Sequence, residues 1–388
     1  MPEAARIRAA GPAMPTETTM SDSDGRDPIA FSPNGRRRAR GLGLPLRGTT
    51  GPLNAITDVP GVTVGMTTLI SGDGEKAVRT GVTAVLPRPP DALLHPCWAG
   101  TFAMNGNGEL TGCHWIREAG WFTGPITITN TCSLGLAHHG TVRWLARHFP
   151  DVIGEGVWPL PVVGETYDGW LNDIAGLHLE ESHVLAAIDG AAGGPVAEGS
   201  VGGGTGMIAY EFKGGTGTAS RRVETKAGTY TLGVLVQANH GIRPWLTVAG
   251  VEVGKQMPEG RFRSAESGSI IVVLATDAPL IPTQLERLAR RIGIGMGRGG
   301  TPSGNDSGDI YLAFSTANDP GQVPLGPTVG FTALGDQEMD PLFTATVDSV
   351  EEAILNAMLA AETMTGRRGR VVQAIDPERL RDLLRARA

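Results

Sequence analysis

The chain has 388 residues, of which 40% are hydrophobic and 19% are charged, so it can bury a large core in one big domain or two ordinary ones. Its formal net charge of -7 excludes the basic surface that nucleic-acid binding requires, and we expect no nucleic-acid partner. No apolar run is long enough to span a membrane, and the N-terminus lacks the order of a signal peptide, which predicts a cytoplasmic protein with no membrane contact.

Residues 1–40 combine Pro, Ser, Asp and Arg with almost no apolar periodicity, and a run of consecutive arginines, Arg36 to Arg38, lies near their end. A segment of this composition cannot bury enough apolar surface to offset the loss of chain entropy on folding. We therefore predict a disordered extension over 1–40 and a single folded domain over 41–388.

Strands dominate the first part of that domain. Short β-branched runs between glycine turns predict strands at 61–64, 81–85 and 126–129. Alternating patterns predict an antiparallel meander at 207–212, 219–224 and 229–237. The run 270–275 is apolar on both faces, which indicates a central strand of a sheet, and another strand is expected at 310–314.

Helices are fewer and come late. An apolar stripe with a polar start predicts a helix over 285–292. Asp348 has the character of an N-terminal cap and predicts a helix over 348–364, and Asp376 predicts the cap of a last helix that ends near residue 384. Because strands outnumber helices and do not alternate with them, the pattern predicts a layered α+β fold.

The spacing of cysteines and histidines gives no sign of a metal site. The cysteines, Cys97, Cys113 and Cys132, lack the short paired spacing of zinc ligands, and the histidines include no HExxH motif. The glycine-rich run 202–206 lacks the Gly-Lys-Ser/Thr ending of a phosphate-binding loop. We expect no metal and no other cofactor.

Ser269 opens the predicted central strand and directly follows Gly268. The pair alone is also what a turn glycine before an ordinary strand looks like. The catalytic interpretation is that the Ser269 hydroxyl attacks the Gly268 carbonyl, because glycine does not obstruct the attack and tolerates a strained backbone. The freed Ser269 would then supply a nucleophile and, through an α-amine with a reference pKa of about 7.7 to 8.0, its general base. Cleavage would divide the domain into 41–268 and 269–388.

Acyl transfer also needs groups that orient the nucleophile and stabilise the oxyanion, and three polar clusters are candidates. Ser307 and Asp309 share one face of an extended segment, so a hydroxyl backed by a carboxylate could orient the serine. Glu165 and Tyr167 are likewise spaced, and could bind a substrate ammonium and donate to an oxyanion. Asn239 follows a strand and offers a side-chain amide as a second donor. Each cluster is also compatible with an ordinary turn.

The order of seven motifs gives these clusters a context. The motifs are GVTVG (61–65), NGNGELTG (105–112), GETYDG (164–169), GGTGM (203–207), QANHG (237–241), GSIIV (268–272) and NDSGD (305–309). Together they resemble the L-aminopeptidase/D-amidase-esterase family, peptidase family S58, to which the β-peptidyl aminopeptidases also belong. The resemblance covers about 41–365.

The resemblance implies a four-layer α/β/β/α sandwich, like the N-terminal nucleophile (Ntn) hydrolases but with different connectivity, and a homotetramer of processed protomers. It assigns the nucleophile to Ser269 and its support to Ser307 and Asp309. By the same resemblance, Tyr167 and Asn239 belong to the oxyanion region, and Glu165 holds the substrate amino group. Some members carry Glu in place of Asp309, and the shorter side chain predicts a looser or water-bridged relay.

The sequence thus predicts an autoproteolytic serine aminopeptidase that cuts itself between Gly268 and Ser269 and then releases N-terminal residues from small peptides, amides and esters with a free amino group. Two alternatives remain at this stage. One is an ornithine acetyltransferase-like acyltransferase, since that group resembles this architecture and also cleaves itself before its nucleophile. Its nucleophile is a threonine, however, and the serine at position 269 argues against this alternative. A non-catalytic binding or assembly module would keep the chain intact.

Overall fold

The structure is a computed structural model that describes residues 25–386. The strands are β1 Thr63–Ser71, β2 Val78–Leu86, β3 Cys97–Gly106, β4 Trp121–Phe122, β5 Ile126–Asn130, β6 Val162–Thr166, β7 Ile208–Ala209, β8 Phe212–Lys213, β9 Gly215–Thr225, β10 Gly228–Asn239, β11 Ser269–Thr276, β12 Gly308–Ser315, β13 Met364–Thr365 and β14 Val371–Val372. The α-helices are α1 Cys113–Ala119, α2 Leu134–His148, α3 Glu181–Asp189, α4 Val253–Gln256, α5 Pro282–Arg298, α6 Met339–Leu359 and α7 Pro377–Arg385.

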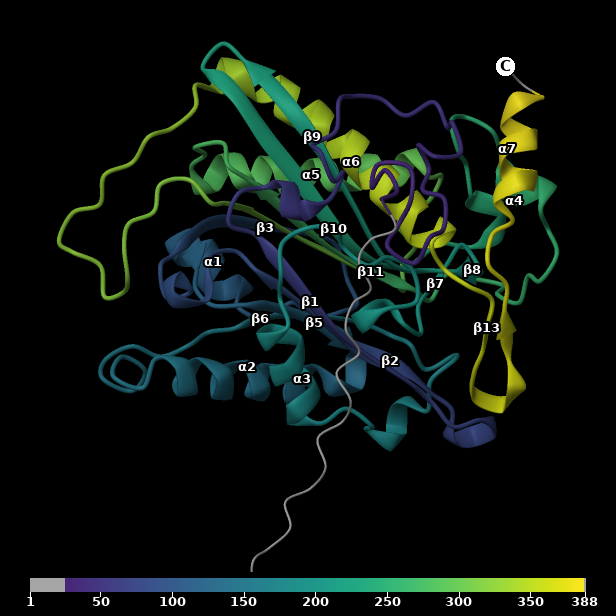
Figure 1. Ribbon diagram of the computed structural model, residues 1–388, viewed down its shortest axis with the longest axis horizontal. Helices are drawn as coiled ribbons and strands as arrows, with labels where there is room; N and C mark the ends of the chain where they lie inside the picture. Colours follow the sequence, from purple (N-terminus) through teal and green to yellow (C-terminus); the bar gives the residue numbers. More distant parts are fainter. Residues whose placement is uncertain (1–24, 387–388) are drawn as a thin grey trace, which may run out of the picture.

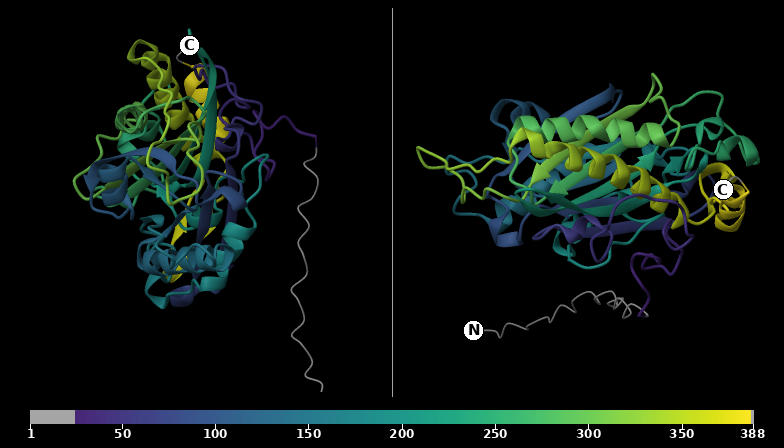
Figure 2. Two further views of the ribbon diagram at one scale, coloured as in Figure 1. Left: turned by 90° about the vertical axis from the view of Figure 1, so that its left-hand side faces the viewer. Right: turned by 90° about the horizontal axis from the view of Figure 1, so that it is seen from above.

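Two mixed sheets form the centre of the molecule. One is four-stranded in the order β1-β2-β5-β6, and the other is six-stranded in the order β4-β3-β12-β11-β10-β9. Helices α5 and α6 cover the outer face of the six-stranded sheet, and α2 and α3 cover the outer face of the four-stranded sheet (Figures 1 and 2). The four-layer α/β/β/α sandwich that the family resemblance implies is therefore confirmed.

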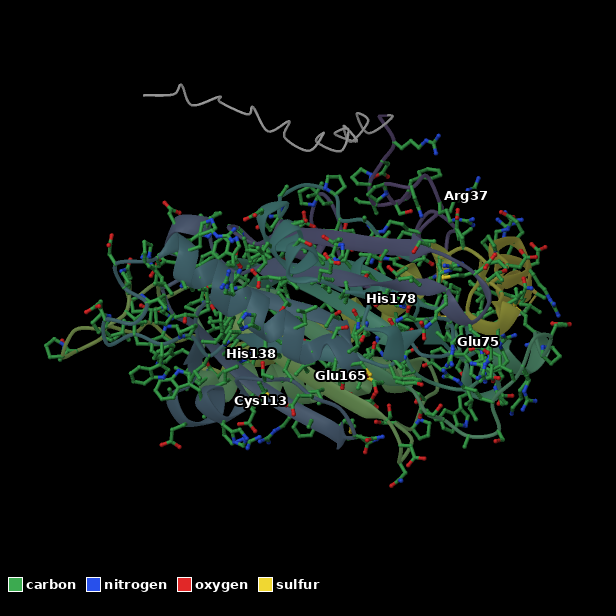
Figure 3. All side chains as sticks on the ribbon, turned by 90° about the horizontal axis from the view of Figure 1, so that it is seen from below. Arg37, Glu75, Cys113, His138, Glu165 and His178 are labelled. Atoms are coloured by element: carbon green, nitrogen blue, oxygen red, sulfur yellow. The ribbon has the colours of Figure 1, made fainter. Side chains whose placement is uncertain are left out.

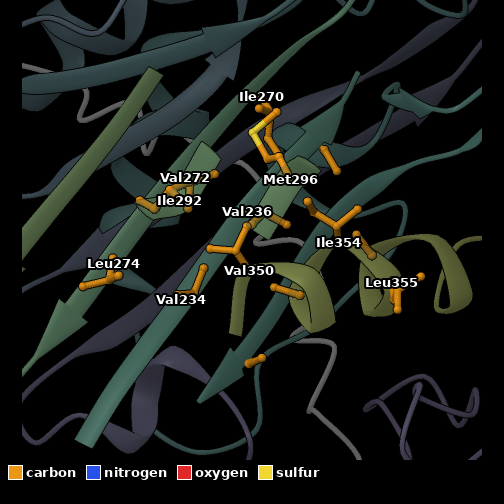
Figure 4. Close-up of a cluster of buried hydrophobic side chains, with 14 of the residues drawn as sticks. Val234, Val236, Ile270, Val272, Leu274, Ile292, Met296, Val350, Ile354 and Leu355 are labelled. Atoms are coloured by element: carbon orange, nitrogen blue, oxygen red, sulfur yellow. The ribbon is translucent and has the colours of Figure 1, made fainter. Parts of the chain in front are cut away.

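Each interface between layers is filled by apolar side chains. The core between the sheets includes Leu235, Ile271 and Leu312, and the core between α2, α3 and their sheet includes Val163 and Val184. The core under α5 and α6 is drawn in Figure 4 and includes Val234, Val236, Ile270, Val272, Leu274, Ile292, Met296, Val350, Ile354 and Leu355. Full burial of one such side chain stabilises the fold by about 1.5–3 kcal/mol.

Strand β11 runs through the middle of the six-stranded sheet, as its apolar pattern predicts. It pairs antiparallel with β10 on one side and parallel with β12 on the other. Ile270 packs into the helix-covered core and Ile271 into the core between the sheets, since successive side chains of a strand point to opposite faces. The first residue of β11 is consequently held on both sides by other strands.

Two of the predicted elements differ from the structure. The segment 207–212 is not one strand of a meander, because Tyr210 and Glu211 have φ of 51° and 59° and turn the chain between the short strands β7 and β8. The helix expected to begin at Asp348 begins at Met339 and ends at Leu359, and the Asp348 carboxylate accepts a hydrogen bond from Arg298 instead of capping a helix. The predicted cap at Asp376 is confirmed by its bonds from two backbone N–H groups.

The predicted disorder of 1–40 does not hold for its described part, residues 25–40. Arg38 is buried, with an ion pair of 2.9 Å to Glu198 and a hydrogen bond of 2.8 Å to the Thr218 carbonyl. The backbone N–H of Ala39 donates to Asn356 in α6 at 3.0 Å. A paired, buried arginine fixes the chain in place although its surroundings in sequence are polar. Residues 1–24 lie outside the described part.

Within residues 25–386, no helix is long and apolar enough to cross a membrane.

Candidate active site

Ser269 lies at the junction of three strands. It is the first residue of β11, it is paired in register with Asn239 at the end of β10 and with Gly308 at the start of β12, and only 7% of its surface is exposed. The backbone N–H of Gly308 donates a hydrogen bond of 3.1 Å to the Ser269 Oγ. The hydroxyl oxygen is therefore held in one place by the backbone of the neighbouring strand.

Gly268 occupies a position where no side chain fits. A Cβ atom built on this residue would lie 2.0 Å from the carbonyl oxygen of Asn239 and 2.8 Å from the Cα of His240. Cβ contacts shorter than 3.0 Å essentially never occur in proteins, so a larger residue here would have to displace the backbone. The glycine before Ser269 thus lets the chain pass directly over the end of β10.

Ser307 and Asp309 flank Gly308, the strand partner of Ser269, and contact each other. The Ser307 Oγ donates to the Asp309 Oδ1 at 2.6 Å, and both residues are fully buried. The other carboxylate oxygen accepts a hydrogen bond from the Ser303 hydroxyl, which itself accepts from the Asn105 amide at 2.9 Å. Burial raises the pKa of Asp309, and the two serine hydroxyls counteract part of that rise. The shorter aspartate reaches Ser307 directly, and the expected looser relay to Ser269 stays a prediction.

Glu165 is the penultimate residue of strand β6 and is buried close to the start of β12. Its carboxylate accepts hydrogen bonds from the backbone N–H of Glu109 at 2.9 Å and from the Thr131 hydroxyl. A Cβ built on Gly108 would lie 3.2 Å from both the Glu165 Oε1 and the Gly308 Cα, so Gly108 lies between the carboxylate and the strand beside Ser269. Burial raises the pKa of Glu165. Figure 3 shows the residue well inside the outline of the molecule seen from below.

Asn239 and Tyr167 are joined to each other through the backbone of Tyr167. The Asn239 Nδ2 donates to the Tyr167 carbonyl at 3.0 Å, and its Oδ1 accepts from the backbone N–H of Ile208 at 2.8 Å. An amide nitrogen carries two protons, so one donor of Asn239 is left for a ligand. The Tyr167 side chain is half-exposed and folds over Gly169, where an added Cβ would meet the phenol oxygen at 2.4 Å.

Two contributors to the site, and one carboxylate that borders it, are missing from the sequence-based prediction. The Gly308 N–H is a backbone group, which residue types do not reveal. Ser303 contacts Asp309 from a left-handed backbone conformation, with φ of 64°, that sequence spacing does not indicate. Glu266 accepts hydrogen bonds from the backbone N–H groups of Gly241 and, at 2.6 Å, Gly304.

The surroundings of the site show neither a metal centre nor a tryptophan-lined pocket. No group of three or more His, Cys, Asp or Glu side chains within residues 25–386 is arranged to hold a metal ion. Trp115, Trp121 and Trp158 line a cavity of about 250 Å³ whose walls do not include Ser269. Trp170 lies in the loop after Tyr167 and stacks on Phe262 with the ring centroids 4.6 Å apart.

Comparisons with known proteins cover the whole of this site. The model of peptidase family S58 matches residues 54–372. The chain is 49% identical over 368 residues to the β-peptidyl aminopeptidase BapA of Sphingosinicella microcystinivorans, a match that spans 90% of this chain and 92% of the relative.

Solved structures agree with that match. The L-aminopeptidase D-Ala-esterase/amidase of Ochrobactrum anthropi, described as a prototype for the serine aminopeptidases and a new variant among the Ntn hydrolase fold, is 54% identical with a TM-score of 0.86 over 90% of this chain and 98% of that one. A β-aminopeptidase from Burkholderia sp. is 46% identical with a TM-score of 0.85 over the same shares of the two chains.

Proposed function

The chain belongs to peptidase family S58 and is a hydrolase that acts on peptide bonds, and from that premise we propose that Ser269 is its nucleophile, freed when the chain cuts itself after Gly268. The observation that carries the proposal is the placement of Ser269. Its hydroxyl is buried at the junction of β10, β11 and β12, follows a glycine that no other residue can replace without a backbone shift, and accepts the Gly308 N–H.

Self-cleavage follows from this placement in two steps. The Ser269 Oγ bonds to the Gly268 carbonyl carbon, the C–N bond to Ser269 breaks, and the hydroxyl proton passes to the departing nitrogen, which leaves an ester and a free amine. Water then adds to the ester carbonyl, so Gly268 gains a terminal carboxylate and Ser269 regains its hydroxyl. Glycine suits the first step because the reacting atoms must approach within a crowded backbone.

The mature enzyme would use the same serine on its substrates. The α-amine of Ser269, with a reference pKa of about 7.7 to 8.0, is the proposed general base for its own hydroxyl. Ser307 and Asp309 are proposed to orient this pair, supported by the hydrogen bond of 2.6 Å between them. A buried carboxylate that accepts hydrogen bonds from two hydroxyl groups keeps those side chains fixed during the reaction.

Substrate recognition is proposed to use the remaining residues. Glu165 is proposed to bind the free amino group of the substrate, because a buried carboxylate with two fixed donors still has lone pairs for an ammonium. Asn239, with one amide proton unused, and Tyr167 are proposed to donate to the oxyanion. The substrates are then small peptides, amides or esters with a free amine, in line with the names of the relatives.

The test uses paired substrates. Wild-type protein should hydrolyse amino-acid p-nitroanilides with a free amine and leave their N-acetylated counterparts uncut, and Ser269→Ala should be inactive on both. Ser307→Ala and Asp309→Ala separate the roles when each is assayed for maturation and for hydrolysis. Equal hydrolysis of acetylated and free substrates would rule out the proposed amine site.

The alternatives make different predictions. A binding or assembly module would stay intact and hydrolyse neither substrate, and an acyltransferase would transfer an acyl group to an amine faster than to water. The proposed homotetramer of processed protomers and the cytoplasmic location remain predictions, the first of which light scattering on purified protein can check.

A further inference from the structure

We propose that Glu266 is a positioning residue for self-cleavage, which fixes the chain immediately before Gly268 against both strands that flank Ser269. The proposal rests on the proposed self-cleavage and adds to it a residue that takes no part in bond making. Its role would be to hold the scissile peptide where the Ser269 hydroxyl can reach it.

The contacts of Glu266 span the site. One carboxylate oxygen accepts the backbone N–H of Gly241, which lies just beyond the end of β10, and the other accepts the N–H of Gly304 at 2.6 Å, in the loop that leads to β12. A Cβ built on Gly304 would lie 2.5 Å from the Glu266 Oε2, so the loop approaches the carboxylate as closely as glycine allows. One side chain thereby connects the two segments that flank Ser269.

The burial pattern around the scissile bond supports this role. Ser264, Ala265 and Ser267 are exposed, whereas Glu266 and Gly268 are buried. These three exposed residues form no hydrogen bond or ion pair with the rest of residues 25–386. The segment before Ser269 is therefore fixed chiefly at Glu266 and by the contact of Gly268 with β10. Without the carboxylate, the unrestrained segment that precedes Gly268 would be longer.

A second anchor lies further back and sets the length of that free segment. The buried Glu211 accepts the backbone N–H groups of Phe262 at 2.5 Å and Arg263 at 2.6 Å. If Glu266 is removed, the restrained chain ends at Arg263 and the residues up to Gly268 gain conformational freedom. Attack on a carbonyl requires a near-attack geometry, and a displacement of about 1 Å can cost about a hundredfold in rate.

The chemistry of the side chain indicates which substitution is informative. Burial raises the pKa of Glu266, and the N–H groups of Gly241 and Gly304 act in the opposite direction by stabilising the carboxylate. Glutamine has the same shape but only one acceptor oxygen, so its NH₂ group would face one of the two N–H donors. Glu266→Gln therefore removes one of the two hydrogen bonds without opening a cavity.

Turnover of the mature enzyme should depend much less on this residue. Cleavage leaves Glu266 on the N-terminal fragment, whereas Ser269 begins the other one. The loop that carries Gly304 keeps an independent anchor, because the Asn105 amide donates to the carbonyls of Ser303 at 2.9 Å and Gly304 at 2.8 Å. We expect the loss of Glu266 to slow maturation and to leave kcat/KM of matured protein within about twofold of the wild-type value.

The experiment follows maturation directly. Wild type, Glu266→Gln, Glu266→Asp and Ser269→Ala are synthesised in a cell-free system with a short pulse of labelled methionine, and uncut chain is quantified over time. We expect the rate constant to fall at least about tenfold in Glu266→Gln, or about 1.4 kcal/mol of activation free energy. Glu266→Asp keeps the negative charge on a side chain one methylene shorter. Its rate constant for maturation should lie between those of wild type and Glu266→Gln. Glu259→Gln, an exposed carboxylate on the same segment, is the matched control and should mature normally.

Each outcome decides the proposal. Maturation of Glu266→Gln at the wild-type rate overturns it, and so does an equal fall in maturation rate and in kcat/KM of the matured fraction, since that pattern means general damage to the site. A melting temperature lowered in Glu266→Gln while Glu266→Asp matures and melts as wild type also overturns it. If the wild-type chain itself stays uncut, the proposed self-cleavage fails and the role of Glu266 fails with it.

Discussion

Replacement of Gly268 by alanine tests the geometry of the scissile bond most sharply. The added Cβ would lie 2.0 Å from the Asn239 carbonyl oxygen, and the shortest separation that real Cβ atoms show is 3.0 Å, so the backbone has to move by about 1 Å. A displacement of that size at a reacting centre costs about a hundredfold in rate. Overpacking of this kind also costs about 1–3 kcal/mol of folding free energy, which the rest of the domain can absorb.

The assay is the fraction of uncut chain over time after pulse-labelled synthesis, with thermal unfolding measured in parallel. We expect Gly268→Ala to remain largely uncut when the wild type has finished, with a folded far-UV spectrum. Gly297→Ala is the matched control, because a Cβ on that helical glycine meets nothing within 4 Å. If Gly268→Ala matures as fast as wild type and melts at the same temperature, the crowding at this bond has no part in the reaction.

Three further predictions concern the groups around Ser269. Ser303→Ala removes one of the two hydroxyls bound to Asp309 and should lower kcat about tenfold with little change in KM, measured on a free-amine p-nitroanilide; an unchanged kcat would show that Ser307 suffices. Glu165→Gln keeps the shape but removes the charge, and should lower kcat/KM for free-amine esters tenfold to a hundredfold, about 1.4–2.7 kcal/mol, while esters without an amine react as with wild type. Burial raises the pKa of Asp309 above 3.8, and protonation removes its acceptors, so the rate of maturation should fall as the pH falls through that raised pKa. A maturation rate that does not fall as the solution is acidified, while the protein stays folded, would contradict the requirement for an ionised Asp309 with a raised pKa.

Some features of this protein are visible in the sequence because they depend on local patterns. Residues 270–275 are apolar on both faces, which predicts a central strand, and that strand is β11. The spacing of Ser307 and Asp309 predicts a shared face, and the two side chains are hydrogen-bonded. Asp376 caps α7 because its cap depends only on the next few residues.

Other features depend on contacts between distant parts of the chain. Arg38 is held in place by Glu198 and by a carbonyl of β9. Both partners are far from residue 38 in sequence, so the residues around it do not predict these contacts. Asp348 looks like a helix cap, yet it lies inside α6 because tertiary packing continues the helix on its N-terminal side and Arg298 pairs with the carboxylate. Local preference was outweighed there by burial of the helix against the sheet.

The same limit applies to the site. Ser303 reaches Asp309 from a loop whose path depends on a left-handed residue, and Glu266 holds two segments that are far apart in sequence. Both are polar residues among small residues, in segments that by sequence resemble ordinary turns. Their positions become meaningful only when the ends of β10 and β12 are seen to meet at Ser269.

The most direct test of the account is the intact mass of freshly purified wild-type protein under denaturing conditions, with Ser269→Ala alongside. The account predicts two wild-type fragments whose masses sum to the full chain plus one water, the second beginning with Ser269, and one uncut mass for Ser269→Ala. A single full-length mass for folded, well-aged wild-type protein would contradict it.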